Sequence, residues 1–101
     1  MTTGDTSASG GQPEAGQTVI IRNQRGLHAR AAAKFVKLAG RFDAAVEVRR
    51  GDTEVSGLSI MGLMMLAAGP GTSVELRARG AEAEAAVAAL ADLILRKFDE
   101  D

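Results

Sequence analysis

Three segments of the chain have the apolar pattern of helices. Apolar residues recur every three or four positions from Ala29 to Ala39 and again from about residue 82 to 97, which is the period of an amphipathic helix. Between these segments, a nearly continuous apolar stretch follows Ser59 and ends at Gly69. Serine is a favoured helix N-cap and glycine a favoured helix C-cap, so we expect a short helix between these two residues.

Four other segments have the pattern of strands. β-branched residues dominate residues 17–22, and apolar and polar residues alternate over residues 44–49 and 74–79. A short strand is expected at residues 53–55, after a turn at residues 50–52. This alternation is typical of a sheet with one face on the core and the other face in water.

The predicted order of elements is strand, helix, strand, strand, helix, strand, helix. It places the chain in the α/β (α+β) class. We expect an open-faced β-sandwich in which three helices cover one face of a four-stranded, mainly antiparallel sheet. This order does not determine function, because domains of similar layout bind RNA, metals or small ligands.

Length and composition narrow the range of functions. A chain of 101 residues suits one domain with a single modest core. Its net charge of -1 gives no general attraction to nucleic acid or membranes, and no apolar run is long enough to span a bilayer. With no Cys and one His, thiolate and multi-histidine metal sites are excluded. We therefore expect no metal, no cofactor, no membrane contact and no nucleic-acid partner.

The beginning of the chain differs in composition from the rest. Residues 1–16 are rich in Gly, Ser, Thr and Gln, and they lack the basic and apolar regions of a secretory signal. Such a segment buries too little apolar surface to offset the entropy lost on ordering. We expect a flexible tail over residues 1–16, a folded domain over residues 17–101, and a cytoplasmic location.

His28 is the best candidate for chemistry. It lies between a turn at residues 23–26 and the start of the first predicted helix, and Arg30 follows two residues later. A helix N-terminus offers free backbone N–H groups to an anion, and a neutral imidazole is a nucleophile. These two residues are thus suited to accept and hold a phosphoryl group. The alternative is that His28 only caps the helix, and that Arg30, Lys34 and Lys37 form a solvated face.

Two segments of the chain resemble parts of a known family. Gly26-Leu27-His28-Ala29-Arg30 and the later Ser59-Ile60-Met61-Gly62-Leu63-Met64 resemble the active-site and regulatory segments of the histidine-containing phosphocarrier (HPr) family. This family serves the bacterial phosphoenolpyruvate phosphotransferase system, and the resemblance extends over residues 17–97. It implies that His28 accepts a phosphoryl group from phosphorylated enzyme I and passes it to a histidine of an enzyme IIA. The protein would be a phosphoryl carrier rather than a stand-alone enzyme.

The resemblance also implies roles for other residues. Arg30 matches the arginine that contacts the phosphoryl group. Ser59 matches the serine that an ATP-dependent HPr kinase/phosphorylase modifies, which makes that kinase a further candidate partner. A phosphate on Ser59 would add about two negative charges to an apolar docking face. We expect the chain to act as a monomer that contacts its partners through Leu27, Lys37, Ile60, Met61 and Met64.

Three positions bear on how closely the chain follows the family. Ala31 stands where the family has proline, and Leu58 precedes Ser59 where many members have lysine. Alanine keeps the helix and restores an N–H that proline lacks, so we expect phosphorylation at His28 to survive with a looser helix start or altered phosphate contacts. The ending Phe98-Asp99-Glu100-Asp101 resembles that of the nitrogen-related branch, which favours a regulatory system over sugar transport.

A function of another class stays open. The chain could be a non-catalytic regulatory module that docks through the helix around Met61, with His28 serving only as a helix cap. The presence of Arg30 beside His28 speaks against this alternative. RNA binding on the open sheet face is a weaker candidate, because no aromatic residue lies on a predicted strand to stack on bases.

Overall fold

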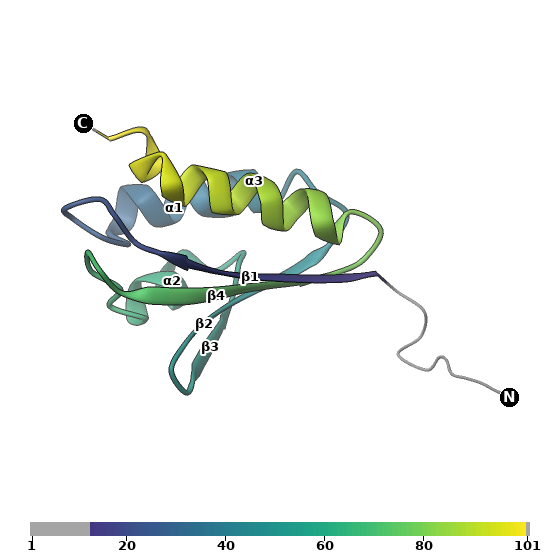
Figure 1. Cartoon of the computed structure of the whole chain (residues 1–101), viewed down its shortest axis with the longest axis horizontal. Coiled ribbons are helices and arrows are strands. Elements are labelled where there is room, and N and C mark those ends of the chain that lie inside the picture. The colour runs from purple at the N-terminus through teal and green to yellow at the C-terminus, as the bar shows by residue number, and fades with distance from the viewer. Residues whose placement is uncertain (1–12, 101) are drawn as a thin grey trace, which may run out of the picture.

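The computed structural model describes residues 13–100, and its elements follow the predicted order (Figure 1). The elements are β1 (Glu14–Ile20), α1 (Ala29–Ala39), β2 (Ala45–Arg50), β3 (Thr53–Ser56), α2 (Ile60–Met65), β4 (Ser73–Arg79), α3 (Ala83–Leu95) and the 3-10 turn η2 (Lys97–Asp99). The bounds predicted for the first helix agree with those of α1. The other elements differ from prediction by a few residues at their ends.

The four strands form one sheet in the order β1-β4-β2-β3, and every pair of neighbours is antiparallel. Figure 1 shows α1 and α3 side by side above the sheet, and α2 packs against α1 and β3. The predicted open-faced arrangement of three helices and four strands is confirmed. The loop after β1 and the end of α3 lie at the same end of the molecule (Figure 1).

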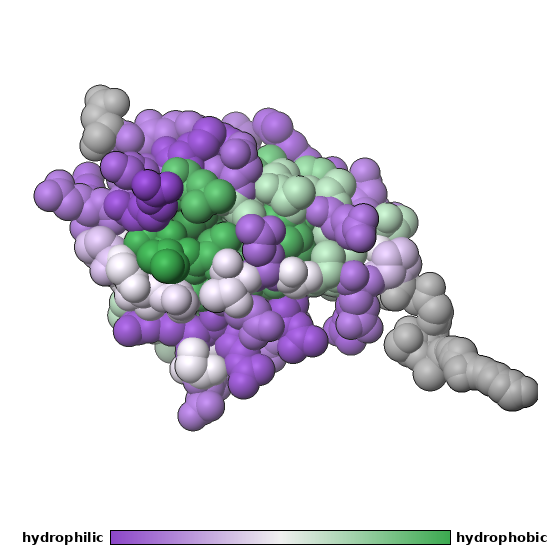
Figure 2. Space-filling view, viewed as in Figure 1, coloured by the Kyte–Doolittle hydropathy of each residue, from purple (hydrophilic) through white to green (hydrophobic). Residues whose placement is uncertain are grey.

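The core lies between the sheet and the helices. On β4, the side chains of Val74, Leu76 and Ala78 are buried, whereas the alternate positions are more exposed. Phe35 of α1 and Phe98 of η2 are the largest side chains that are fully buried. Figure 2 shows a band of apolar side chains between the helix layer and the sheet, with polar side chains on both sides of it. Burial of this apolar surface is the main force that holds the layers together.

The first strand begins earlier than the strand predicted at residues 17–22. β1 starts at Glu14, and residues 14–16 pair with residues 77–79 of β4. Most side chains in this part of β1 are exposed, so backbone hydrogen bonds order it without much apolar burial. Composition reflects side chains, so it does not reveal a pairing between backbone groups. Residues 1–12 of the expected tail lie outside the described residues.

α2 ends earlier than expected. The helix stops at Met65 with Leu66 as its C-cap, so the predicted cap at Gly69 is wrong. The Arg50 guanidinium at the end of β2 donates to the carbonyl oxygens of Leu66 and Ala67, at 2.8 and 2.9 Å. A side chain from another element thus satisfies carbonyl groups that a glycine cap would otherwise serve.

The end of α3 also differs from its prediction. The helix ends at Leu95 instead of residue 97, and Lys97, Phe98 and Asp99 then have φ values of 60°, 55° and 59°. Left-handed backbone costs roughly 1 kcal/mol or more for each residue that has a Cβ. The burial of Phe98, which is 0% exposed, offsets this cost and holds the turn against the core.

Candidate active site

A tight loop places His28 at the start of α1. Gly26 in this loop has a φ of 65°, and a Cβ added there would lie 2.3 Å from the carbonyl oxygen of Ala68. The backbone N–H of Leu27 donates to the same oxygen at 3.0 Å. Because only glycine accepts both the left-handed φ and the close approach, the loop is fixed against the segment that follows α2.

His28 is the N-cap of α1, and its imidazole takes part in the cap. The residue has an extended backbone, and its Nδ1 accepts the backbone N–H of Arg30 at 3.3 Å. A backbone N–H can only donate, so Nδ1 carries a lone pair rather than a hydrogen. The structure therefore leaves the lone pair of Nδ1 beside the free N–H groups of the first helical turn.

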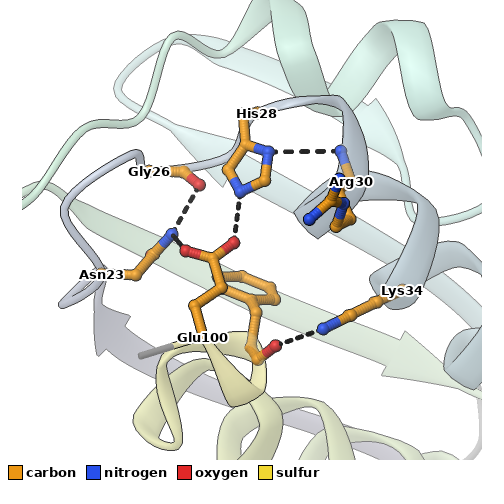
Figure 3. A network of polar contacts seen from close by, with 7 residues as sticks. Asn23, Gly26, His28, Arg30, Lys34 and Glu100 are labelled. Carbon is orange, nitrogen blue, oxygen red and sulfur yellow. Dashed lines mark hydrogen bonds and ion pairs between the residues drawn. The ribbon is translucent and has the colours of Figure 1, made fainter.

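The other ring nitrogen of His28 contacts the C-terminal residues. Its Nε2 forms a hydrogen bond with Oε2 of Glu100 (Figure 3). The second oxygen of that carboxylate accepts from Nδ2 of Asn23 at 3.1 Å, and Asn23 Nδ2 also donates to the carbonyl of Gly26 at 2.8 Å. Since an ionised carboxylate only accepts hydrogen bonds, Nε2 is the nitrogen that carries the hydrogen.

Glu100 is ionised in this setting. Burial by itself raises the pKa of the Glu100 carboxyl, but hydrogen bonds from His28 and Asn23, with the charge of Arg25, lower it further than burial raises it. The resulting pKa lies below the usual range of a glutamate. The carboxylate is therefore negatively charged at neutral pH.

A groove of about 600 Å³ lies next to these contacts. Asn23, Arg30 and Glu100 line this groove. Arg30 and Glu100 also form hydrogen bonds with the His28 ring, and Asn23 forms one with Glu100. Its cationic residues are Arg22, Arg25, Arg30, Lys34 and Lys97. Such a concentration of positive charge beside a helix N-terminus suits a dianionic group and an acidic protein partner.

Three residues of this site were not singled out by the sequence analysis. Lys34, assigned there to a solvated face, donates from Nζ to the carbonyl of Phe98 at 2.7 Å and so joins α1 to η2. Asn23 counted only as a turn residue, and Glu100 only as part of an ending. The contact between His28 and Glu100 spans 72 positions, so no local pattern could reveal it.

The second predicted segment forms a separate cap and an apolar surface. Ser59 is the N-cap of α2, as predicted, and its Oγ accepts the backbone N–H of Gly62 at 2.9 Å. Leu63 is fully buried. We define the α2 patch as the apolar side chains exposed on and beside this helix, namely Leu58, Ile60, Met61, Met64 and Met65.

Leu27 does not extend the α2 patch. Its side chain is only 7% exposed and belongs to the core, because the loop before α1 is held against Ala68. The expectation of an exposed apolar residue there is wrong. Lys37 is exposed in the last turn of α1 and does not line the groove beside His28. Its role at the rim stays a prediction.

Ala31 is fully buried in the first turn of α1. The small side chain therefore packs in the core. The helix begins at Ala29, as predicted.

Two further properties concern only residues 13–100. Within this range no helix is both long and apolar enough to cross a membrane. The same part of the chain contains no cluster of three or more His, Cys, Asp or Glu residues that could hold a metal ion.

Comparison with known proteins agrees with this arrangement. The family model described as "PTS HPr component phosphorylation site" matches residues 15–96. This chain belongs to the HPr family. The resemblance of the two sequence segments is thereby confirmed, and the protein is a phosphocarrier of the phosphotransferase system. Membership in the HPr family implies protein partners within that system.

Individual relatives support the same assignment to the HPr family. The chain is 50% identical over 84 residues to the phosphocarrier protein HPr of Neisseria meningitidis, covering 83% of this chain and 94% of the relative. It is 44% identical over 82 residues to the phosphocarrier protein NPr of Shewanella violacea, covering 81% and 90%. The crystal structure of HPr-C-His from Thermoanaerobacter tengcongensis matches with a TM-score of 0.82 and 42% identity, covering 86% of this chain and 98% of that chain.

Proposed function

We propose that His28 accepts a phosphoryl group on Nδ1 from phosphorylated enzyme I and passes it to a histidine of an enzyme IIA. One observation carries this proposal. Nδ1 of His28 has its lone pair at the N-terminus of α1, 3.3 Å from the N–H of Arg30, while Nε2 is occupied by Glu100. The nitrogen that is free to form a new bond is thus the one beside the anion-binding end of the helix.

The transfer needs positioning and charge neutralisation more than proton movement. The lone pair of Nδ1 forms the new bond to phosphorus as the bond between phosphorus and the donor breaks. The N–H of Arg30 then turns from Nδ1 to a phosphoryl oxygen, and the Arg30 guanidinium can supply two further donors. The cationic groove beside the ring reduces the repulsion between the incoming group and the protein.

The α2 patch is the proposed contact surface for both partners. Met61 and Met65 are 74% and 75% exposed, and methionine adapts its shape to more than one partner. Ile60 and Met64 complete the part of the patch expected to touch enzyme I and enzyme IIA, and Lys37 is proposed as a rim contact for acidic residues. We also propose that the protein works as a cytoplasmic monomer, with residues 14–100 as its phosphocarrier domain.

Ser59 is a proposed regulatory site. Its Oγ already serves as a helix cap, and a phosphate in that place would lie next to the apolar side chains of Ile60 and Met61. About two added negative charges there would disfavour partners that dock on a neutral surface. An HPr kinase/phosphorylase is the corresponding candidate partner.

The branch of the system is a finer proposal. The ending at residues 98–101 and the similarity to the NPr of Shewanella violacea support the nitrogen-related branch. The relative named HPr from Neisseria meningitidis is at least as similar, so sugar transport stays the alternative. A transfer assay with acceptor proteins of both kinds decides between them.

The decisive experiment uses enzyme I, phosphoenolpyruvate and the purified chain. We expect the intact mass to increase by one phosphoryl group, the added group to be lost in acid, and His28→Ala to gain none. Arg30→Ala should accept the group about tenfold more slowly, because a charge-assisted hydrogen bond to the phosphoryl group is lost. Arg41→Ala, which removes an exposed cation just beyond the same helix and outside the groove, is the matched control.

A contrary result has a clear meaning. If several active enzyme I proteins fail to phosphorylate the wild type, His28 is not a phosphoryl acceptor. The docking module that uses the α2 patch would then be the better account.

A further inference from the structure

The C-terminal turn, defined as residues 97–100, has an unusual backbone that several contacts hold in place. Lys97, Phe98 and Asp99 are all left-handed, and none of them is glycine. The side chain of Phe98 is fully buried, and its carbonyl accepts from Lys34 Nζ at 2.7 Å. Arg96 pairs with Asp99 at 3.0 Å. Sparsely populated backbone that is held this firmly is most often found where it positions a functional group.

The group that this turn positions is the Glu100 carboxylate. One of its oxygens bonds to Nε2 of His28 and the other to Nδ2 of Asn23 (Figure 3). The ring and the carboxylate are 20% and 19% exposed, so water competes little for this contact. Asn23 also holds the carbonyl of Gly26, which ties the carboxylate to the loop that sets the position of His28.

We propose that Glu100 is a positioning residue for phosphoryl transfer, which holds the Nε2–H form of the His28 ring and offsets the positive charge that the ring gains when Nδ1 is phosphorylated. This inference rests on the function proposed above. It assigns to one side chain a role in orienting the nucleophile and in stabilising the phosphorylated state.

The role follows from the electron balance of the transfer. When Nδ1 uses its lone pair to bond phosphorus, the bond to the donor nitrogen breaks and its electron pair stays with the donor. No proton leaves the His28 ring, so a ring that still carries hydrogen on Nε2 becomes positively charged. A carboxylate that accepts this hydrogen stabilises the charged ring. In transfer to the next protein, the bond between phosphorus and Nδ1 breaks and its electron pair returns to a neutral ring.

Glu100 is not needed to hold the turn itself. Phe98 supplies the apolar burial, and Lys34 and Arg96 supply the polar contacts of the turn. Within residues 13–100, the Glu100 side chain forms hydrogen bonds only with His28 and Asn23. A substitution at this position should therefore change the orientation of the His28 ring and its Nε2–H form, while the fold persists.

The test compares wild type with Glu100→Ala and Glu100→Gln by NMR and by transfer kinetics. Because His28 is the only histidine, its ring nitrogen and ring N–H signals can be assigned without ambiguity. We expect wild type to show a strongly deshielded Nε2–H proton that exchanges slowly with water, and Glu100→Ala to lack it. The initial rate of phosphoryl transfer from enzyme I should fall about tenfold in Glu100→Ala. The amount of phosphoryl group finally bound should stay at one per chain.

Glu100→Gln separates charge from hydrogen bonding, because the amide can still accept from Nε2–H but is neutral. Its rate should lie between those of wild type and Glu100→Ala. Glu84→Gln, on an exposed position of α3, is the matched loss of one carboxylate and should leave the ring signals and the rate unchanged. Melting temperatures of all variants verify that each is folded.

The outcomes distinguish this inference from the function on which it rests. Loss of the ring N–H signal together with slower transfer supports the role of Glu100. Unchanged transfer in Glu100→Ala overturns that role, whether or not the ring signal changes. Absence of transfer to the wild type overturns the proposed function, and with it the role of Glu100, and is recognised because every variant fails alike.

Discussion

The N-caps of α1 and α2 perform the same structural task in different surroundings. Nδ1 of His28 accepts a backbone N–H at 3.3 Å, and Oγ of Ser59 accepts one at 2.9 Å. Next to His28 lie a carboxylate and a groove with five cationic residues. Next to Ser59 lie the apolar side chains of the α2 patch, and the first turn of α2 contains no acidic residue.

This difference fits the proposal that His28 exchanges a phosphoryl group, whereas Ser59 is only modified by one. The cap hydrogen bond at His28 is long, and the imidazole has a second partner in Glu100. Nδ1 can therefore give up the cap hydrogen bond while Nε2 still holds the ring in place. Ser59 has the geometry of an ordinary cap. A phosphate at His28 would meet positive charge, whereas a phosphate at Ser59 would charge a neutral surface.

The largest expected effect comes from breaking the loop that holds the His28 cap. Gly26→Ala combines a left-handed φ with a Cβ placed 2.3 Å from a backbone oxygen, and we expect it to lower the free energy of unfolding by about 3 kcal/mol. Chemical denaturation followed by circular dichroism measures this loss. Gly51→Ala is the matched control, because Gly51 has a φ of 59° and nothing within 4 Å of its added Cβ. Equal losses in both variants would show that the contact with Ala68 contributes nothing.

An intermediate effect is expected at the other cap. Ser59→Ala removes the acceptor of the Gly62 N–H and should cost about 1 kcal/mol of unfolding free energy. It should leave phosphoryl transfer to His28 nearly unchanged, since the two caps belong to different helices. Denaturation and the enzyme I assay measure the two quantities on the same sample. A large loss of transfer in this variant would mean that the two caps are not independent.

The smallest expected effect is a dependence of the unfolding free energy on pH, which arises from the contact between Glu100 and His28. The pKa of Glu100 is lowered in the fold from its ordinary value of about 4.3, so its contact stabilises the protein fully above that value. The contribution is lost as pH falls through the lowered folded value. The groups that face the carboxylate are His28, Asn23 and Arg25.

The measurement is the difference in unfolding free energy between wild type and Glu100→Gln. We expect about 0.5 kcal/mol at pH 7, because the pair lies near the surface, and a difference near zero below pH 3. A difference that grows as pH falls would contradict the charge assigned to Glu100.

The parts of the fold that local patterns determine could be predicted from the sequence. The bounds of α1 follow from the periodicity that ends at Ala39, and Ser59 was identified as a cap from its residue type and position. The strand around Leu76 follows from alternation. In each case the determining residues are neighbours in sequence, so the physical cause is visible in a short window.

The features that the sequence did not reveal depend on residues far apart in the chain. α2 stops early where Ala67 adopts a left-handed backbone, and Arg50 from β2 bonds to the carbonyl groups of Leu66 and Ala67 just beyond the helix. Leu27 is buried because of a loop after α2. Glu100 reaches His28 only because three successive residues adopt left-handed backbone, which Lys97 and Phe98 disfavour. Tertiary contacts override local preference at all three places.

The pairing of β1 with β4 has a consequence for the speed of folding. Glu14 pairs with Arg79 and Ile20 with Ser73, so the first strand of the chain finds its place only after most of the sequence is available. The contact between His28 and Glu100 closes a similarly long loop of 72 positions. Non-local closures of this kind slow folding, because the entropy of the loop is lost before the contacts are gained. We therefore expect the chain to complete the proposed phosphoryl-transfer site late on the folding pathway, after the sheet that carries it has assembled.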